Sequence, residues 1–328
     1  MAVFPTSGDF TTDPTYTGSF IPTLWSGKLL AKFYQNTMLS EIMNTDYEGE
    51  LKNKGDTIRI RTAPSITIND YTGAGSTLAT EVPVPIFQDM QVNKAKYFSV
   101  QTNDVLAQQA DMDLMNMFTE DAAKQLKIAI EDEVFFNTFV TNGPAAANAG
   151  GTAGAISANY NLGTDLAPVA VSGAASAGLL NTILAMSAAL DEQNVPEDGR
   201  FLVISPFDRQ ILMQTNIAQA YFTGDSSSII RTGKIGMLDR FTVYVSNLLP
   251  KGAAAKALVP GLSATSGGAA LARRTMVAGT KHACSFAMTI SKTEPLRNQT
   301  DFGDIVRGLA VYGRKVVKNE ALIVAKVL

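Results

Sequence analysis

The clearest alternation of apolar and polar residues lies close to residue 60. Ile58 and Ile60 alternate with Arg59 and Arg61, which is typical of a strand that buries one face and exposes a charged one. We therefore predict a half-buried strand at this point, with both arginines on its outer side.

A turn and a returning segment follow this strand. Two glycines within residues 73–75 mark the turn, and alternate prolines within residues 82–86 remove hydrogen-bond donors, which is typical of a sheet edge. Residues 94–100 form the last part of the return, so the sequence predicts a two-stranded excursion over residues 56–100. An isolated ribbon of two strands is only marginally stable in water, so this one must lie against another surface.

The excursion leads into a pattern with helical spacing. Asn103 or Asp104 can cap a helix that continues to about Val140, and at 1.5 Å per residue this helix is roughly 55 Å long. One apolar stripe runs along it: Leu114, Phe118, Ala122, Leu126, Ile130 and Val134. The predicted length exceeds the diameter of a small domain, so we expect a spine that several other elements share.

The N-terminal region is different in character. Residues 1–19 have no hydrophobic period, which indicates an extended arm, and the apolar spacing within residues 25–43 predicts a short helix. We therefore interpret residues 1–55 as an arm that carries a short amphipathic helix.

Beyond the spine, two regions rich in small residues, 142–177 and 252–268, are predicted to be flexible insertions or surface loops. Residues 166–190 carry no charge and could cross a bilayer by length alone, but their Gly, Ser, Asn and Pro content favours a short buried helix near residues 179–194.

Further strands complete an α+β pattern. The run Arg200–Ile204 is apolar after its first residue, which is typical of a central buried strand, and Pro206 can begin a helix directly after it. The other predicted strands lie at residues 241–245, 275–279, 286–291, 310–317 and 321–327.

Composition narrows the possible functions. The chain has 328 residues and a formal net charge of −3, and only 17% of its residues are charged, against roughly 25% in typical globular proteins. A surface with little charge is often covered by partners. Without clustered Lys and Arg, direct readout of nucleic acid is disfavoured, and contact with DNA is expected to be nonspecific.

Candidate catalytic and metal-binding residues are scarce. The single His282 and the single Cys284 are too few for a histidine-based triad, a zinc site or a disulfide framework. They lie two positions apart on a predicted strand and so share a face, but a lone Cys is usually a packing residue. Ser205 lacks the flanking glycines of a nucleophile elbow. We therefore predict no enzymatic activity, no catalytic residues, no cofactor and no metal.

The order of these elements resembles that of the major capsid (coat) proteins of tailed bacteriophages, which have the Hong Kong-type capsid fold. Local stretches similar to recurrent segments of these coat proteins are Phe20–Ser26, Gly55–Ile58, Phe201–Pro206, Gly236–Asn247 and Tyr312–Val317.

The resemblance implies a division of the chain. Residues 1–55 would be the N-terminal arm and residues 56–100 the two-stranded E-loop. Residues 101–142 and about 282–308 would form the P-domain with the spine helix. Residues 143–281 and about 309–328 would form the strand-rich A-domain with its small-residue insertion loops.

The resemblance also implies a function and partners. Copies of the chain would form pentamers and hexamers that close into an icosahedral head around double-stranded DNA, assembled in the cytoplasm of a host bacterium. A portal protein and possibly a decoration protein would join the shell, and no membrane is involved. Some family members carry a scaffolding segment of about a hundred residues before the arm, and its absence here implies a separate scaffolding protein.

The E-loop would lie across a neighbouring subunit. We expect Arg59 and Arg61 to form salt bridges with acidic residues of the neighbour's spine: Glu120, Asp121, Glu131 or Glu133. Some family members join subunits covalently through an E-loop lysine. No lysine occurs between Lys54 and Lys94 in this chain, so we expect no such cross-link.

Two alternatives remain at the level of sequence. An encapsulin-type nanocompartment shell has the same fold and differs in holding cargo enzymes rather than DNA. A hydrolase of the α/β class would need alternating strands and helices, which the first hundred residues lack.

Overall fold

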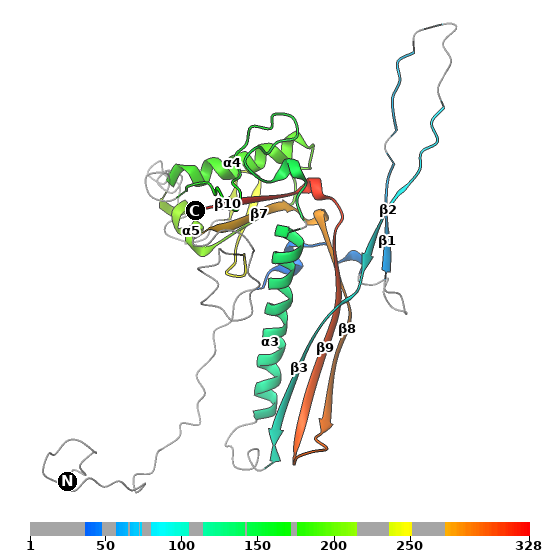
Figure 1. Cartoon of the computed structure of the whole chain (residues 1–328), viewed down its shortest axis with the longest axis vertical. Coiled ribbons are helices and arrows are strands. Elements are labelled where there is room, and N and C mark those ends of the chain that lie inside the picture. The colour runs from blue at the N-terminus through cyan, green and yellow to red at the C-terminus, as the bar shows by residue number, and fades with distance from the viewer. Residues whose placement is uncertain are drawn as a thin grey trace, which may run out of the picture.

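The computed structural model describes residues 37–47, 57–64, 66–71, 73, 80–104, 114–141, 143–171, 176–214, 236–250 and 273–328. Most of the predicted N-terminal arm and the second small-residue region, 252–268, lie outside the described residues. Of the helix predicted within residues 25–43, the described part is α1 (Leu39–Ile42). Figure 1 shows three parts: a projecting ribbon, a long helix beside a narrow sheet, and a wider sheet with helices.

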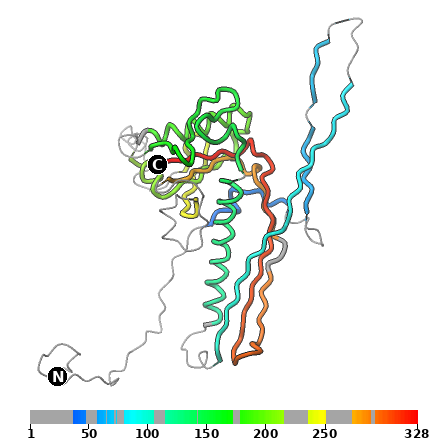
Figure 2. The backbone as a smooth tube through the Cα atoms, in the orientation of Figure 1, coloured from blue at the N-terminus to red at the C-terminus, as the bar shows by residue number. Residues whose placement is uncertain are grey.

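The ribbon consists of β1 (Thr57–Thr62) and β2 (Ile86–Gln91), which pair in antiparallel fashion. The alternation seen in the sequence is confirmed, because Ile58 and Ile60 are buried while Arg59 and Arg61 are exposed. After β1 the chain extends further from the body, and it comes back along a neighbouring path into β2, as the tube in Figure 2 also shows.

The last part of the predicted ribbon has a different partner. Residues 94–100 belong to β3 (Lys94–Asn103), which pairs with β9 (Gly303–Val316) instead of returning along β1. The prediction that these residues complete a two-stranded excursion is therefore wrong. Periodicity identifies a strand, but it does not identify which strand pairs with it.

A three-stranded antiparallel sheet results, in the order β3-β9-β8, where β8 is Cys284–Arg297. β8 and β9 are 14 residues each, much longer than the predicted strands. The predicted boundary between P-domain and A-domain near residue 308 falls within β9. The division into domains stays a prediction.

The spine helix lies alongside this sheet (Figure 1). It comprises α3 (Leu114–Val134) and a π-helical segment over Phe135–Thr141, so the predicted C-terminal end near residue 140 agrees with the structure. Gly143 packs against the end of this helix: a Cβ atom added at this position would lie 2.3 Å from the Phe139 carbonyl oxygen. A side chain at this position has no room, so the glycine permits the chain to turn away.

The wider sheet has the order β10-β7-β4-β6-β5. β4 (Arg200–Ile204) is buried along its whole length and lies at the centre of this sheet, as predicted. Its neighbours are β6 (Phe241–Val245), which is parallel to it, and β7 (Arg274–Thr280), which is antiparallel. The edges are β5 (Met237–Leu238) and β10 (Leu322–Val327).

Two helices accompany this sheet, α4 (Ser176–Glu192) and α5 (Pro206–Gln214). Leu179, Ile183 and Met186 of α4 are fully buried, which confirms a short buried helix in the uncharged stretch. They share one core with Phe135 and Phe139 of the spine. Short 3₁₀ turns occur at Ala146–Asn148, Lys281–Ala283 and Asn319–Ala321.

The described part of the first small-residue region, 143–171, packs against the body and is no flexible insertion. The buried Asn148 donates hydrogen bonds to the carbonyl oxygens of Glu320 and Leu322, and Val169 forms a β-bridge with Val327. Of the two predicted alternatives, the described residues agree with a surface loop, since many of them are exposed and outside any strand or α-helix. Small residues allow close backbone approach as readily as they allow flexibility.

The buried carboxylate Asp208 organises the start of α5. It accepts a hydrogen bond of 2.7 Å from the Ser205 hydroxyl, and a second of 2.7 Å from Nε of Arg274. Replacing Asp208 with Ala leaves the mostly buried guanidinium of Arg274 without its ion pair. We expect the free energy of unfolding to fall by about 3–5 kcal/mol, measured by chemical denaturation of the unassembled subunit.

The matched control is Glu197→Ala, which removes one of the two exposed acidic partners of Arg240 and leaves Asp191 in place. Exposed pairs contribute little, so this variant should unfold almost like the wild-type chain. Equal losses for the two variants would contradict the assignment of Asp208 as a buried anchor.

Candidate inter-subunit surfaces

The base of the ribbon is anchored by its apolar face. Ile58 and Ile60 of β1 and Met90 of β2 pack with Val92 and with Ala287 of β8 in a small hydrophobic cluster of their own. The ribbon is therefore held to the body at one end only, and the rest of it extends away (Figures 1 and 2).

The outer face of the ribbon carries the two predicted arginines. Arg59 forms a two-pronged ion pair with Asp89, its neighbour across the ribbon, with N···O distances of 2.9 and 3.2 Å, and its guanidinium lies 5.5 Å from the centre of the Phe87 ring. Hydrogen bonding from Arg59 lowers the pKa of the Asp89 carboxyl. Arg61 is exposed and has no ion pair among the described residues.

Beyond the paired strands, the ribbon exposes apolar side chains. Its described residues place these large apolar groups in solvent, together with Ile86 at the start of β2: Ile66, Ile68, Tyr71, Val82 and Val84. Ile68 is 89% exposed and Val82 is 80% exposed. Single apolar residues on a surface are common, but here several lie on one element. A group of this kind on a projecting element is typical of a protein interaction site.

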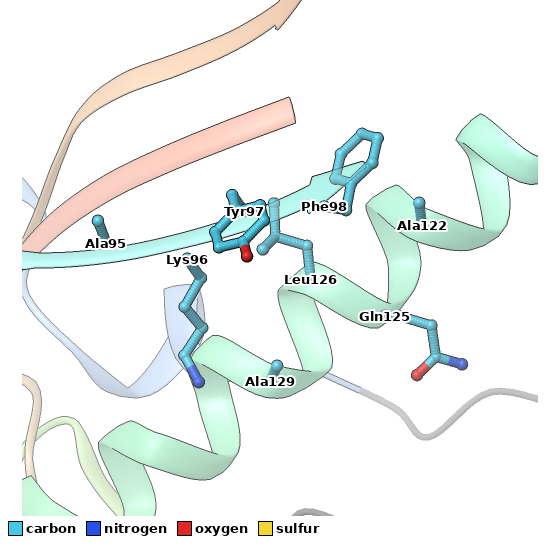
Figure 3. Close-up of a pocket in the computed structure, with 8 residues that line it drawn as sticks. All are labelled: Ala95, Lys96, Tyr97, Phe98, Ala122, Gln125, Leu126 and Ala129. Atoms are coloured by element: carbon cyan, nitrogen blue, oxygen red, sulfur yellow. The ribbon is translucent and has the colours of Figure 1, made fainter. Parts of the chain in front are cut away.

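A groove between β3 and α3 is the complementary feature. Figure 3 shows its lining, which comes from Ala95, Lys96, Tyr97 and Phe98 on the strand and from Ala122, Gln125, Leu126 and Ala129 on the helix. The cavity volume is about 450 Å³. Small alanines on the helix leave this space open, and the surrounding surface is mainly apolar, so the groove suits side chains from another chain.

The four predicted acidic residues do not form one exposed strip. Glu120 is exposed and Asp121 is half-buried on α3. Glu131 is only 1% exposed and accepts hydrogen bonds from the backbone of residues 38 and 39 in its own chain. Glu131 is thus used within the subunit.

Glu133 is also used within the subunit. The Tyr312 hydroxyl donates to it, Arg314 Nη2 lies 3.0 Å from Oε1, and Lys96 Nζ lies 3.8 Å from Oε2. Burial raises the pKa of Glu133, but the hydrogen bonds from Tyr312 and Arg314 outweigh burial and the pKa is lowered overall. This carboxylate fixes the spine helix to β9.

The three residues considered for catalysis, His282, Cys284 and Ser205, are not brought together in the structure. His282 is exposed in a 3₁₀ turn, whereas Cys284 is fully buried at the start of β8. The two residues therefore do not share one face of a strand, contrary to the prediction. Burial raises the pKa of the Cys284 thiol, which keeps it unreactive. The Ser205 hydroxyl bonds Asp208 and caps α5.

The residues that the structure describes hold no group of three or more His, Cys, Asp or Glu placed to bind a metal ion. Among these residues, too, no helix combines the length and apolar character that crossing a bilayer requires.

Sequence reasoning missed the groove and the partner of Arg59. The alanines at 122 and 129 recur at a spacing of seven residues, which puts them on one helix face, but their strand neighbours are distant in sequence. Asp89 could have been found from the ribbon register, because residues 59 and 89 face each other directly.

Comparison with solved structures identifies the fold. A chain from Mycobacterium phage Che8 is 24% identical with a TM-score of 0.70, over 93% of this chain and 96% of that one. The capsid of Cyanophage P-SCSP1u is 15% identical with a TM-score of 0.66, over 94% and 93% of the two chains. The mature capsid of bacteriophage PhiM1 is 14% identical with a TM-score of 0.67, over 99% of each chain. The chain therefore has the Hong Kong-type capsid fold.

A search of curated protein sequences finds no match. A family model described as phage capsid protein matches residues 89–325. This match covers more than two thirds of the chain, from β2 to β10, and it agrees with the sequence resemblance and with the fold. The chain belongs to the phage capsid protein family.

Proposed function

We propose that this capsid protein assembles as pentamers and hexamers into a closed icosahedral shell that encloses double-stranded DNA. The projecting ribbon with its exposed apolar side chains is the observation that carries this proposal. Such a surface is unfavourable on a free monomer and becomes favourable when a neighbour covers it.

The proposed contact joins the ribbon of one copy to the groove between β3 and α3 of the next. Both surfaces are apolar, and each lies outside the core of its own chain. The groove can take up several aliphatic side chains at about 450 Å³. Burying one Ile or Val contributes about 1.5–3 kcal/mol, so a few side chains per contact suffice for association.

Charged residues would add orientation to this contact. Arg61 has no ion pair among the described residues of its own chain, and Glu120 is exposed on the spine. We therefore propose Arg61 and Glu120 as the first inter-subunit salt bridge, with the half-buried Asp121 as a second acceptor. Arg59, Glu131 and Glu133 already have partners within their own chain, so they are less suitable.

Other parts of the proposal follow from the role as a wall. No catalytic function is proposed, since Cys284 is buried and Ser205 caps α5 within the subunit. A net charge of −3 suits a shell that contacts packaged DNA only nonspecifically, because tight phosphate binding would hinder packaging. A separate scaffolding protein, a portal protein and possibly a decoration protein are the proposed partners, with assembly in the bacterial cytoplasm.

Electron microscopy of the chain co-expressed with its genomic neighbours tests this function. We expect closed shells of uniform size that contain DNA when the portal and packaging proteins are present. Denaturing electrophoresis of the boiled shells should give one band at the subunit mass, because the ribbon lacks a lysine between positions 54 and 94.

Four results would contradict parts of this proposal. Small discrete oligomers would exclude a shell, and a shell filled with cargo enzymes would favour a nanocompartment. A ladder of covalent multimers would show that another residue forms cross-links. Uniform shells of the correct size from the chain expressed alone would remove the need for a scaffolding protein.

The apolar contact is tested at the ribbon tip. The double change Ile68→Ser and Val82→Ser removes two exposed side chains that contribute little to the isolated subunit. We expect shell yield to fall at least tenfold, as measured by sedimentation, while the melting temperature of the subunit stays constant.

Two further variants sharpen this test. Ile156→Ser removes an apolar side chain that is 80% exposed on another part of the surface, and it should leave shell yield unchanged. Ala122→Leu fills the groove from the other side and should lower yield as the tip variant does. A normal yield from both the tip variant and Ala122→Leu would exclude this contact.

The charged contact is tested by reversal. Replacing Arg59 and Arg61 with Glu should lower shell yield, because attraction to the neighbour's acidic residues becomes repulsion. Added salt should then raise the yield of the variant, whereas it lowers that of the wild-type chain. Each exposed pair contributes little, but the contact recurs around the whole shell. The exchange Arg59→Asp with Asp89→Arg keeps the pair within the ribbon and serves as the control. Unchanged yield after the double reversal would refute the salt-bridge proposal.

A further inference from the structure

The segment that leads into the body, residues 38–46, passes between the spine helix and β8. Met38, Ile42 and Met43 are buried in the main core. The backbone N–H of Asn44 donates to Cys284 at 2.9 Å, and the N–H of Phe286 donates back to Asn44 at 2.9 Å. This segment is therefore docked against both the main core and β8.

Glu131 of the spine holds the start of this segment. Its Oε2 accepts hydrogen bonds from the backbone N–H groups of Met38 and Leu39, at 2.8 and 3.2 Å. Met38 is the N-cap of α1 and makes no capping bond with its own side chain. A carboxylate from 93 residues away thus satisfies donors that are normally satisfied locally.

The other carboxyl oxygen of Glu131 differs in its hydrogen bonding. Oε1 is buried and has no hydrogen-bond partner within the described part of the chain. Glu131 also lines a cavity of about 320 Å³ together with Lys127, Leu39, Phe286 and Met288. A buried acid with one satisfied and one unsatisfied oxygen is costly to keep ionised.

The charges around Glu131 do not offset this cost. Lys127 lies one turn earlier on α3 and is exposed at the same cavity. On α1, Glu41 is exposed and interacts with Tyr244, and β8 contributes only the uncharged Phe286 and Met288 at the cavity. Asp132 is the adjacent acid on α3. Burial raises the pKa of Glu131 to about 7, although the two backbone N–H groups oppose the rise.

We propose that Glu131 is a proton-linked anchor for residues 38–46. The segment is held most firmly when the carboxyl group is protonated, and it loosens as the carboxyl group ionises. The anchor thereby makes the attachment of the preceding chain sensitive to pH near neutrality. This role goes beyond shell formation and exists in a single subunit.

The direction of the effect follows from proton linkage. When residues 38–46 are released, Glu131 loses the cover that buries it and titrates near its ordinary pKa of 4.5, whereas beneath the docked segment it titrates near 7, so docking takes up a proton between these values. The contribution of Glu131 is fully present below pH 4.5, falls as pH rises to about 7, and is constant above that. The docking equilibrium should weaken by up to about two orders of magnitude over this range.

Hydrogen–deuterium exchange of the full-length, unassembled chain tests the proposal. After correction for the intrinsic pH dependence of exchange, protection of peptides covering residues 38–46 should drop at least tenfold between about pH 5 and pH 8. Peptides from α4, which lie in the same core, should keep constant protection. Protection of residues 38–46 that does not change with pH would overturn the proposal.

Two variants and one further measurement complete the test. Glu131→Gln keeps an acceptor for both N–H groups without a charge, so protection should become independent of pH, whereas Lys127→Gln should keep the wild-type pH dependence. An unchanged pH dependence in Glu131→Gln would refute the role of this residue.

If that variant does not fold, infrared difference spectra of the wild-type chain decide: a buried carboxylic acid that ionises near pH 7 supports the proposal, and its absence refutes it. Because no step requires assembly, failure here is distinguishable from failure of the shell proposal.

Discussion

The exposed apolar surface of the ribbon is the constraint on which the rest of the structure depends. Two strands alone bury too little to be stable, so the ribbon needs a hydrophobic base within its own chain and a cover outside it. The base is supplied by Ala287 and Val92, which join Ile58, Ile60 and Met90. This anchoring leaves the outer part of the ribbon projecting, with side chains such as Ile68 in solvent. The long sheet provides the base for this ribbon and, in the contact that we propose, the sheet and the spine of a second copy provide the surface that receives it.

Strand and helix patterns along the chain predicted much of this architecture, because each depends on local periodicity. The period of two at Ile58 and Ile60, the buried run at β4 and the helical pattern of α3 and α4 all gave the correct type of element. Pairing is different, since β3 meets β9 across two hundred residues of sequence. Nothing local to residues 94–100 distinguishes the return of a ribbon from a strand of a separate sheet, so this part of the prediction was wrong.

The acidic residues of the spine show that local sequence patterns also fail to predict the partners of side chains. Glu131 and Glu133 are two positions apart on a helix, so they point about 200° apart around its axis. One reaches the backbone at Met38 and the other reaches Tyr312 and Arg314. Sequence alone gave two carboxylates on a long helix, for which a solvated or intermolecular face is the natural interpretation. Only the packing of other elements on both sides of the helix turns them into internal anchors, and exposed Glu120 then becomes the better candidate for contact between subunits.

This internal use of charge changes the meaning of the low charge content. Only 17% of the residues are charged, and several of them are buried or mostly buried in ion pairs within the subunit, such as Asp208 with Arg274 and Glu133 with Arg314. The charge left for the surface is therefore lower than the composition suggests. A monomer with such a surface has weak electrostatic protection against association. For a chain whose copies must cover one another, that weakness is an advantage, because apolar contacts can form without first removing water from many charged groups. In the contact that we propose, apolar side chains supply the strength, and an exposed charge without an ion pair among the described residues, such as Arg61, can set the orientation.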